Sequence, residues 1–177
     1  IVVLPARGGM GRNVEHQFNV IASIFAKKLG GQYRLLHIPD HLRAESMETL
    51  LNEPDIKSVI DNLQNADILI YGIGRAQDMM QRRNFTPEQQ RKLERLGAVA
   101  EAFGYFFNGK GEIVYACNSI WLKMDNLKRI PKVIAVAGGR QKARAIMATF
   151  KHWKRGILVT DEGAAREMIC LAEIDGN

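Results

Sequence analysis

The chain has 177 residues, of which 46% are hydrophobic and 25% are charged. This length supports one sizeable hydrophobic core and is short for two ordinary domains, so we expect one globular domain. Lys and Arg total 25 against 19 Asp and Glu, and this net charge of +6 favours anionic partners such as phosphates or nucleic acid. No apolar run reaches the roughly 18–20 residues of a membrane-spanning helix. The two cysteines, Cys117 and Cys170, form no CxxC pair. We therefore expect a reduced, cytoplasmic protein without a disulfide framework, a metal site or a membrane partner.

Short apolar strands and helices alternate along the chain. Strands are predicted at residues 1–4, 33–38, 66–74, 131–139 and 155–161. Helices are predicted at about residues 13–29, 41–65, 86–96, 140–151 and 162–173. Because the strands are continuously apolar, both faces of their sheet should be covered. The pattern therefore predicts an α/β fold, a parallel sheet with helices on both faces.

Two local signals refine this prediction. Thr86, followed by Pro87 and by Gln89, has the form of a helix cap, with proline at the first helical position. Residues 98–107 and 112–119 are two apolar runs joined by the glycine turn NGKG. They predict a β-hairpin inserted into the α/β pattern.

A glycine-rich loop follows the first strand, in the stretch PARGGMGRNVEHQ at residues 5–17. A loop that opens a helix exposes unpaired N–H groups at the positive end of the helix dipole. Glycine lets an anion approach the backbone, and Arg7 can grip a phosphate through two hydrogen bonds. Asn13 could cap the helix, with Gln17 one turn later on the same face. Neither GxGxxG nor GxxxxGK[ST] is present, so a glycine-rich turn with an incidental arginine is the alternative.

The stretch AVAGGRQKA at residues 135–143 repeats this arrangement, with Gly138 and Gly139 before a helix that carries Lys142. Loops at the carboxyl ends of parallel strands face one crevice, where open α/β sheets bind ligands. The alternative is a turn that needs small residues, with Lys142 in solvent.

Several charged residues have both a binding and a structural interpretation. Of the adjacent Arg82 and Arg83, at most one should point into a site, while the other is solvated or paired. Glu101 lies in an apolar strand and needs a partner, which could be sugar hydroxyls or an arginine; it could also be a solvent-facing residue of the hairpin. Asp161 and Glu162 could be an acid and a base, or could cap the last helix.

Taken together, PARGGMG with Gln17, QRRN, EAFGYFFN, VIAVAGG with Lys142, and VTDEGAA resemble the effector-binding domain of the SorC/DeoR-type bacterial sugar regulators. The resemblance covers nearly the whole chain. It implies a Rossmann-like fold of the sugar-phosphate isomerase and deaminase superfamily, used as a ligand sensor and not as an enzyme, with no cofactor. It also implies that a phosphorylated glycolytic sugar, with fructose-1,6-bisphosphate as the leading candidate, binds the domain and weakens repression.

The resemblance further implies roles for individual residues. Arg7, Gln17 and Arg82 would grip one phosphate, and Glu101 would bind the sugar hydroxyls. The residues toward the other phosphate would be Gly11, Gly138, Gly139 and Lys142, and Asn13 completes the predicted binding set. The family's helix-turn-helix domain, which binds operator DNA, and its first sheet strand precede the position of Ile1. We therefore expect a C-terminal fragment of a regulator that forms a homo-oligomer, a dimer or tetramer whose assembly the sugar phosphate alters.

Two other functions were weighed. A sugar-phosphate isomerase or deaminase of the same fold needs a positioned base, for which Asp161, Glu162 or Glu101 are the candidates. A nucleotide-binding Rossmann domain lacks its glycine fingerprint here, and Asp40 lies too far along the chain to be the usual ribose partner.

Overall fold

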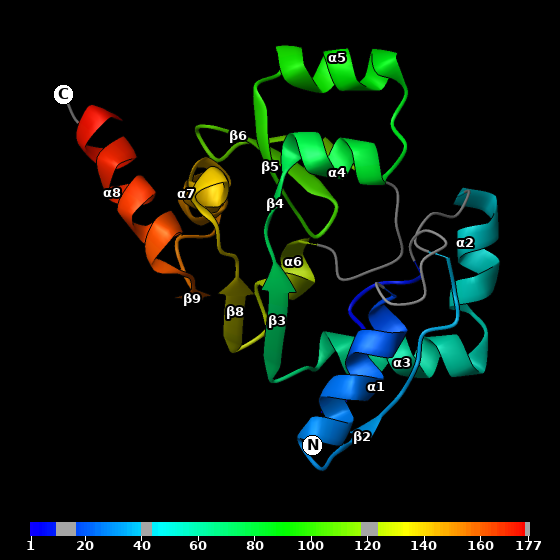
Figure 1. Cartoon of the computed structure of the whole chain (residues 1–177). Coiled ribbons are helices and arrows are strands. Elements are labelled where there is room, and N and C mark those ends of the chain that lie inside the picture. Colours follow the sequence, from blue (N-terminus) through cyan, green and yellow to red (C-terminus); the bar gives the residue numbers. More distant parts are fainter. Residues whose placement is uncertain (10–16, 40–43, 118–123, 176–177) are drawn as a thin grey trace. The chain divides into compact units, whose positions relative to one another are not determined.

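The structure is a computed structural model that describes residues 1–9, 17–39, 44–117 and 124–175 (Figure 1). The chain divides into two compact units. The first unit comprises Ile1–Asp67 and Asn118–Pro131, and the second comprises Ile68–Cys117 and Lys132–Asn177. Each unit has its own strands and helices, so we describe each by itself.

In its described residues, the first unit has one small parallel sheet and four helices. In the sheet, β1 (Val2–Val3) pairs with β2 (Gln32–Tyr33). The helices are α1 (Phe18–Lys28), α2 (Ala44–Leu51), α3 (Pro54–Gln64) and α6 (Met124–Leu127). The helical segment predicted over about 41–65 contains two helices, because Glu53 is extended and Pro54 begins α3. The strand predicted over 33–38 is confined to β2, although Leu36 and Ile38 are buried.

The start of α1 differs from the prediction. Gln17 is the extended residue that precedes the helix, with ψ 132°, so α1 begins at Phe18 and not near Asn13. The predicted place of Gln17 one turn into the helix is therefore wrong. The predicted cap by Asn13 falls outside the described residues, and so does Gly11. Within α1, the Asn19 side chain holds the backbone of Leu36 by donating to its carbonyl (3.1 Å) and accepting from its N–H (2.9 Å).

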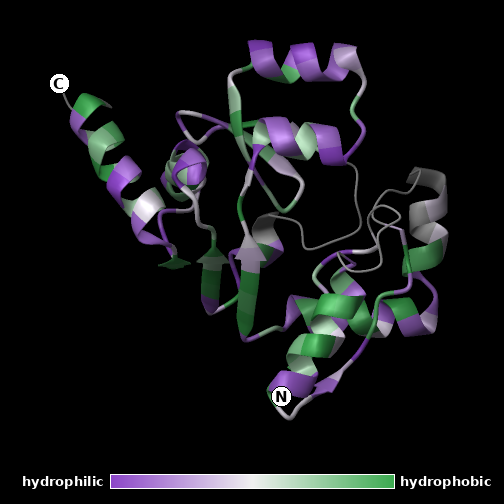
Figure 2. Ribbon diagram, in the orientation of Figure 1, coloured by the Kyte–Doolittle hydropathy of each residue, from purple (hydrophilic) through white to green (hydrophobic). Residues whose placement is uncertain are grey.

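The second unit contains the parallel sheet that the sequence predicted. Its strands are β3 (Ile68–Gly72), β8 (Lys132–Val136) and β9 (Ile157–Val159), in the order β3-β8-β9. Leu69, Val133 and Ala135 are buried on one face, and the strands are strongly hydrophobic (Figure 2). The opposite face carries side chains that are 47–51% exposed, namely Ile68, Ile70, Val136, Ile157 and Val159. The second unit, taken by itself, thus buries one face of this sheet.

An antiparallel sheet lies beside this one in the same unit, in the order β4-β5-β6-β7. Its strands are β4 (Gly74–Arg75), β5 (Ala98–Ala102), β6 (Tyr105–Asn108) and β7 (Ile113–Ala116). The single strand predicted over 98–107 is wrong, because the chain reverses at Phe103 and Gly104, both of which have positive φ (55° and 78°). The predicted glycine turn does join β6 to β7.

The helices of the second unit include one that the sequence did not reveal. That helix is α4 (Ala76–Arg82), and it is followed by α5 (Pro87–Arg95). The predicted cap of α5 is confirmed, because Thr86 and Gln89 exchange both hydrogen bonds of a capping box. The remaining elements are the 3-10 turn η2 (Arg140–Lys142), α7 (Ala143–Trp153) and α8 (Glu162–Asp175). Among the described residues, no helix combines the length and the apolar character needed to cross a membrane.

Candidate functional site

Backbone hydrogen bonds hold the first glycine-rich loop, at Gly8 and Gly9, within the first unit. The N–H of Gly9 donates to the carbonyl of Ile38 (2.8 Å), and Gly9 pairs in parallel with Pro39. A Cβ at Gly8 would lie 2.5 Å from the carbonyl oxygen of Ile38, so only glycine fits there. Gly8 therefore serves close packing against residues 38–39, and the N–H of Gly9 already has a protein acceptor.

Arg7 is buried in the same loop, with only 8% of its surface exposed. Its guanidinium carbon lies 5.4 Å from the centroid of the Phe18 ring, a cation–π distance at the first residue of α1. Gln17 lies beside the loop too, because its Oε1 would be 3.0 Å from a Cβ at Gly9. The structure thus brings Gln17 next to Gly9 and sets Arg7 against an aromatic face.

The second glycine-rich loop is held by a carboxylate. The N–H of Gly139, whose φ is +95°, donates to Asp161 Oδ2 (2.6 Å), and the N–H of Ala164 donates to Asp161 Oδ1 (2.8 Å). A Cβ at Gly138 would collide with the same carboxylate. Asp161 therefore caps α8, which confirms the structural interpretation of this residue. It also occupies the glycine N–H group that the predicted phosphate contact requires.

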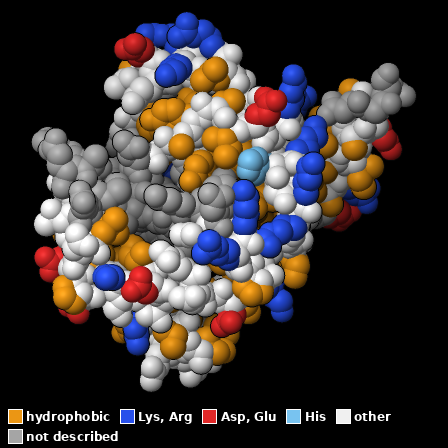
Figure 3. Space-filling view, turned by 180° about the vertical axis from the view of Figure 1, so that it is seen from behind, with side chains coloured by type: hydrophobic (Ala, Val, Ile, Leu, Met, Phe, Trp, Pro, Cys, Tyr) orange, Lys and Arg blue, Asp and Glu red, His pale blue; other side chains and the backbone are white. Residues whose placement is uncertain are grey.

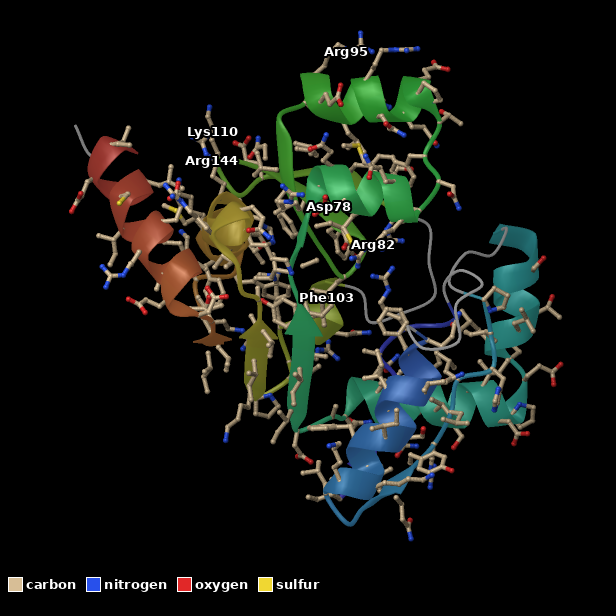
Figure 4. The ribbon with its side chains drawn as sticks, in the orientation of Figure 1. Asp78, Arg82, Arg95, Phe103, Lys110 and Arg144 are labelled. Carbon is tan, nitrogen blue, oxygen red and sulfur yellow. The ribbon has the colours of Figure 1, made fainter. Side chains whose placement is uncertain are left out.

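Asp78 in α4 is a carboxylate whose pKa depends on three positive side chains of the second unit. Arg75 binds the Asp78 carboxylate with two hydrogen bonds of 2.7 and 2.6 Å (Figure 4). These bonds lower the pKa of Asp78, partial burial opposes the shift, and the charges of Arg75, Arg82 and Lys142 lower it further. Arg82 lies one helical turn after Asp78, and Lys142 comes from η2, more than fifty residues along the chain. Two predicted ligand residues, Arg82 and Lys142, thus act on one carboxylate.

Glu101 is buried in β5 and bound to Arg83, the residue that follows α4. Arg83 Nη2 lies 2.8 Å from Glu101 Oε1, and the two side chains are 0% and 5% exposed. The N–H of Gly104 donates to the same oxygen (2.6 Å). The solvent-facing interpretation of Glu101 is therefore wrong, and its role as the anchor of an arginine is confirmed. Of the adjacent arginines, Arg82 is exposed, and Arg83 is the one that is buried and paired.

Aromatic side chains surround the turn that follows Glu101. The Phe103 ring packs on Tyr71 of β3, with centroids 4.3 Å apart, and meets the edge of Trp153 at 5.9 Å. Burial raises the pKa of Tyr71 to about 12, so its hydroxyl stays protonated. Figure 4 shows Phe103 near the end of β3, below Asp78 and Arg82. The described residues hold no cluster of three or more His, Cys, Asp or Glu side chains that could bind a metal ion.

Sequence reasoning missed three residues of this arrangement. Arg75 and Asp78 were overlooked because α4 itself was not recognised, although their i,i+3 spacing is a usable signal once the helix is assumed. Arg83 was weighed only as one of a pair, and its partner lies 18 residues away. On the face shown in Figure 3, Lys and Arg side chains lie in several groups among hydrophobic and acidic ones, which agrees with a scattered positive charge.

Comparisons with known proteins match this chain along nearly its whole length. The family described as "Putative sugar-binding domain" matches residues 1–170. The Central glycolytic genes regulator of Bacillus subtilis (strain 168) is 43% identical over 169 residues, which cover 96% of this chain and 50% of the relative. The Transcriptional regulator LsrR of Escherichia coli (strain K12) is 38% identical over 144 residues, which cover 75% of this chain and 45% of the relative.

A solved structure supports the same assignment. It is "the putative SorC family transcriptional regulator from Enterococcus faecalis", which is 43% identical, with a TM-score of 0.87 over 95% of this chain and 68% of that chain. The chain spans about half the length of the curated relatives that it matches. The chain therefore belongs to the sugar-binding domain family of the SorC/DeoR-type transcriptional regulators.

Proposed function

We propose that this chain is the effector-binding part of a bacterial repressor of glycolytic genes, and that its effector is a phosphorylated sugar, with fructose-1,6-bisphosphate first among the candidates. One observation supports the proposal: the positive charges of Arg82 and Lys142, which come from distant segments, both lower the pKa of the Asp78 carboxyl. A guanidinium and an ammonium that converge in this way suit a phosphate group. The name of the Bacillus relative, a regulator of central glycolytic genes, points to a glycolytic sugar.

The phosphate in this proposal is held mainly by side chains. The resemblance assigned Arg82 to one end of the ligand and Lys142, with the glycines, to the other. Since both cations act on Asp78, we propose instead that they hold the same phosphate. In the proposal, the Glu101 carboxylate accepts hydrogen bonds from sugar hydroxyls. Arg7 and Gln17 of the first unit remain proposed ligand residues.

An enzymatic role finds less support. Asp161 caps α8 and Glu162 pairs with Arg166 on the surface, while Glu101 is bound to Arg83. Each carboxylate nominated as a catalytic base thus has a structural partner. The relatives reported above carry the names of regulators, which agrees with a sensor.

Isothermal titration calorimetry with fructose-1,6-bisphosphate tests the proposal. Arg82→Gln and Lys142→Gln should each weaken binding by about tenfold or more, because each removes a charged hydrogen-bond donor from a phosphate. Arg95→Gln is the matched control, because Arg95 lies on α5 well away from Asp78 in Figure 4. Absence of binding to the unmodified protein, or equal affinity in all variants, would contradict the proposal.

In the longer regulator, the effector must bind one conformation or assembly better than another, because equal affinity shifts no equilibrium. We propose that the sugar phosphate weakens operator binding through a separate DNA-binding domain and alters the packing of protomers. The coupling is reciprocal, so operator DNA should weaken sugar-phosphate binding by the same factor. Titrations of the longer protein with and without operator DNA measure both factors; an unchanged affinity would remove the allosteric claim.

A further inference from the structure

The ion pair between Arg83 and Glu101 is unusual because both charges are almost completely buried. The side chains are 0% and 5% exposed, and Arg83 Nη2 lies 2.8 Å from Glu101 Oε1. Removing two charges from water is costly, and an apolar pair of similar volume often supports a fold equally well. A buried pair of this kind therefore calls for a role beyond packing.

The carboxylate of Glu101 also holds the turn between β5 and β6. Ala102 and Tyr105 are paired across this turn, so Phe103 and Gly104 are its two central residues. Both have positive φ, as in a type I′ turn, where Asn or Asp is usual at the first position and Phe is strained. The N–H of Gly104 donates to Glu101 Oε1 at 2.6 Å, and the Phe103 ring packs on Tyr71. Strained backbone held by a charged group is typical of functional sites.

The same ion pair connects this turn to the end of α4, which carries Arg82, a proposed phosphate-binding residue. Arg83 directly follows Arg82 at the end of α4, and Arg82 is exposed whereas Arg83 is buried. One arginine therefore faces solvent beside Asp78, and its neighbour fixes Glu101. The buried bond from Arg83 Nη2 to Glu101 Oε1 thereby joins the residue after Arg82 to the Glu101 carboxylate.

We propose that Arg83 is a positioning residue for sugar recognition: it fixes the Glu101 carboxylate and the Phe103–Gly104 turn at a set distance from Arg82. The protein can thereby distinguish a sugar bisphosphate from an anion that lacks hydroxyl groups. This inference rests on the proposed function. It assigns to Arg83 no contact with the ligand.

Calorimetric titration with two ligands tests the proposal. Fructose-1,6-bisphosphate has phosphates and hydroxyls, whereas hexane-1,6-diol bisphosphate has the phosphates alone. Arg83→Lys keeps the charge but loses the planar fork, so it should weaken binding of the sugar bisphosphate by about tenfold. Binding of the diol bisphosphate should stay within about twofold, because Arg82 and Lys142 are unchanged. Arg95→Lys, on the surface of α5, is the control.

The outcomes separate the two proposals. If the unmodified protein binds neither bisphosphate, the proposed function fails and this inference fails with it. If the unmodified protein prefers the sugar bisphosphate and Arg83→Lys weakens both ligands equally or neither, Arg83 has only a structural role and the inference alone is overturned.

A measurement on the unmodified protein covers the case in which Arg83→Lys does not fold. The amide resonance of Gly104, which reports the bond to Glu101, should shift in NMR spectra when the sugar bisphosphate is added. It should shift much less with the diol bisphosphate. Equal shifts with both ligands, or none with either, would overturn the inference.

Discussion

The two glycine-rich loops look alike in the sequence, but the structure uses their glycines differently. In the first loop, Gly8 allows the backbone to lie against Ile38, and the N–H of Gly9 is bound by the Ile38 carbonyl. In the second, Gly139 has a φ of +95° and donates to Asp161. In both loops a glycine N–H already has an acceptor within the protein. The comparison teaches that similar glycine patterns can serve different local structures, and it is the reason that the proposed function assigns the charged phosphate contacts to the side chains of Arg82 and Lys142.

The largest loss of stability is expected from a substitution at Gly8, because the atoms that a new side chain would meet belong to the backbone. Gly8→Ala would place a Cβ 2.5 Å from the Ile38 carbonyl oxygen, so the loop must move. We expect the free energy of unfolding to fall by about 2–3 kcal/mol, measured by urea denaturation. Gly9→Ala is the control, because its nearest neighbour is the end of the Gln17 side chain, which can shift. If both variants lost the same unfolding free energy, close packing at Gly8 would not distinguish it from Gly9.

A smaller loss of unfolding free energy is expected from a substitution at Gly139, because the backbone there has a positive φ. Gly139→Ala puts a side chain at a φ of +95°, which should cost about 1–2 kcal/mol in the same assay. Gly109→Ala is the matched control, since a Cβ there meets nothing within 4 Å. If Gly139→Ala were no more destabilising than Gly109→Ala, the second loop would not depend on its left-handed residue.

The next smaller loss of stability is expected from removing the Asp161 carboxylate, which holds the second loop. Asp161→Ala removes the cap of α8 and the acceptor for Gly139, and should lower the unfolding free energy by about 1 kcal/mol. Glu162→Ala, which removes only an exposed pair with Arg166, should change it by less than about 0.5 kcal/mol. Thermal unfolding of both variants measures this contrast. The reverse order would show that Glu162, and not Asp161, holds the loop.

The smallest effect concerns the pH dependence of Asp78. The folded pKa of this carboxyl lies below its ordinary value of 3.8, mainly because Arg75 donates to it. Its contribution to stability is thus present above the unfolded pKa and is lost as the pH falls through the folded pKa. Asp78→Asn should therefore lose less unfolding free energy than the unmodified protein when the pH is lowered below about 4. Identical pH profiles would contradict the ion pair with Arg75.

Features that depend on neighbouring residues were predictable from the sequence. The capping box at Thr86 and Gln89 and the cap by Asp161 are local hydrogen-bond patterns, and both are confirmed. The parallel strands were visible because their apolar runs are bounded by turn residues. The resemblance to sugar regulators was confirmed by the comparisons.

Features that depend on tertiary contacts were missed. The turn at Phe103 and Gly104 carries no ordinary turn residue at its first position, so residues 98–107 looked like one strand. An arginine could be predicted as the partner of Glu101, but the sequence does not indicate which one. Arg83 is identified only because the fold brings it to Glu101. The start of α1 was placed too early because apolar spacing continues through Val14, before the helix begins.

A double-mutant cycle tests most directly the central claim, that Arg82 and Lys142 hold the same phosphate. Calorimetric affinities for fructose-1,6-bisphosphate would be measured for Arg82→Gln, Lys142→Gln and the double variant. We predict that the double variant loses less binding free energy than the sum of the single losses, because residues that share one partner are coupled. Losses that add fully would place the two cations on different groups of the ligand and would contradict the account.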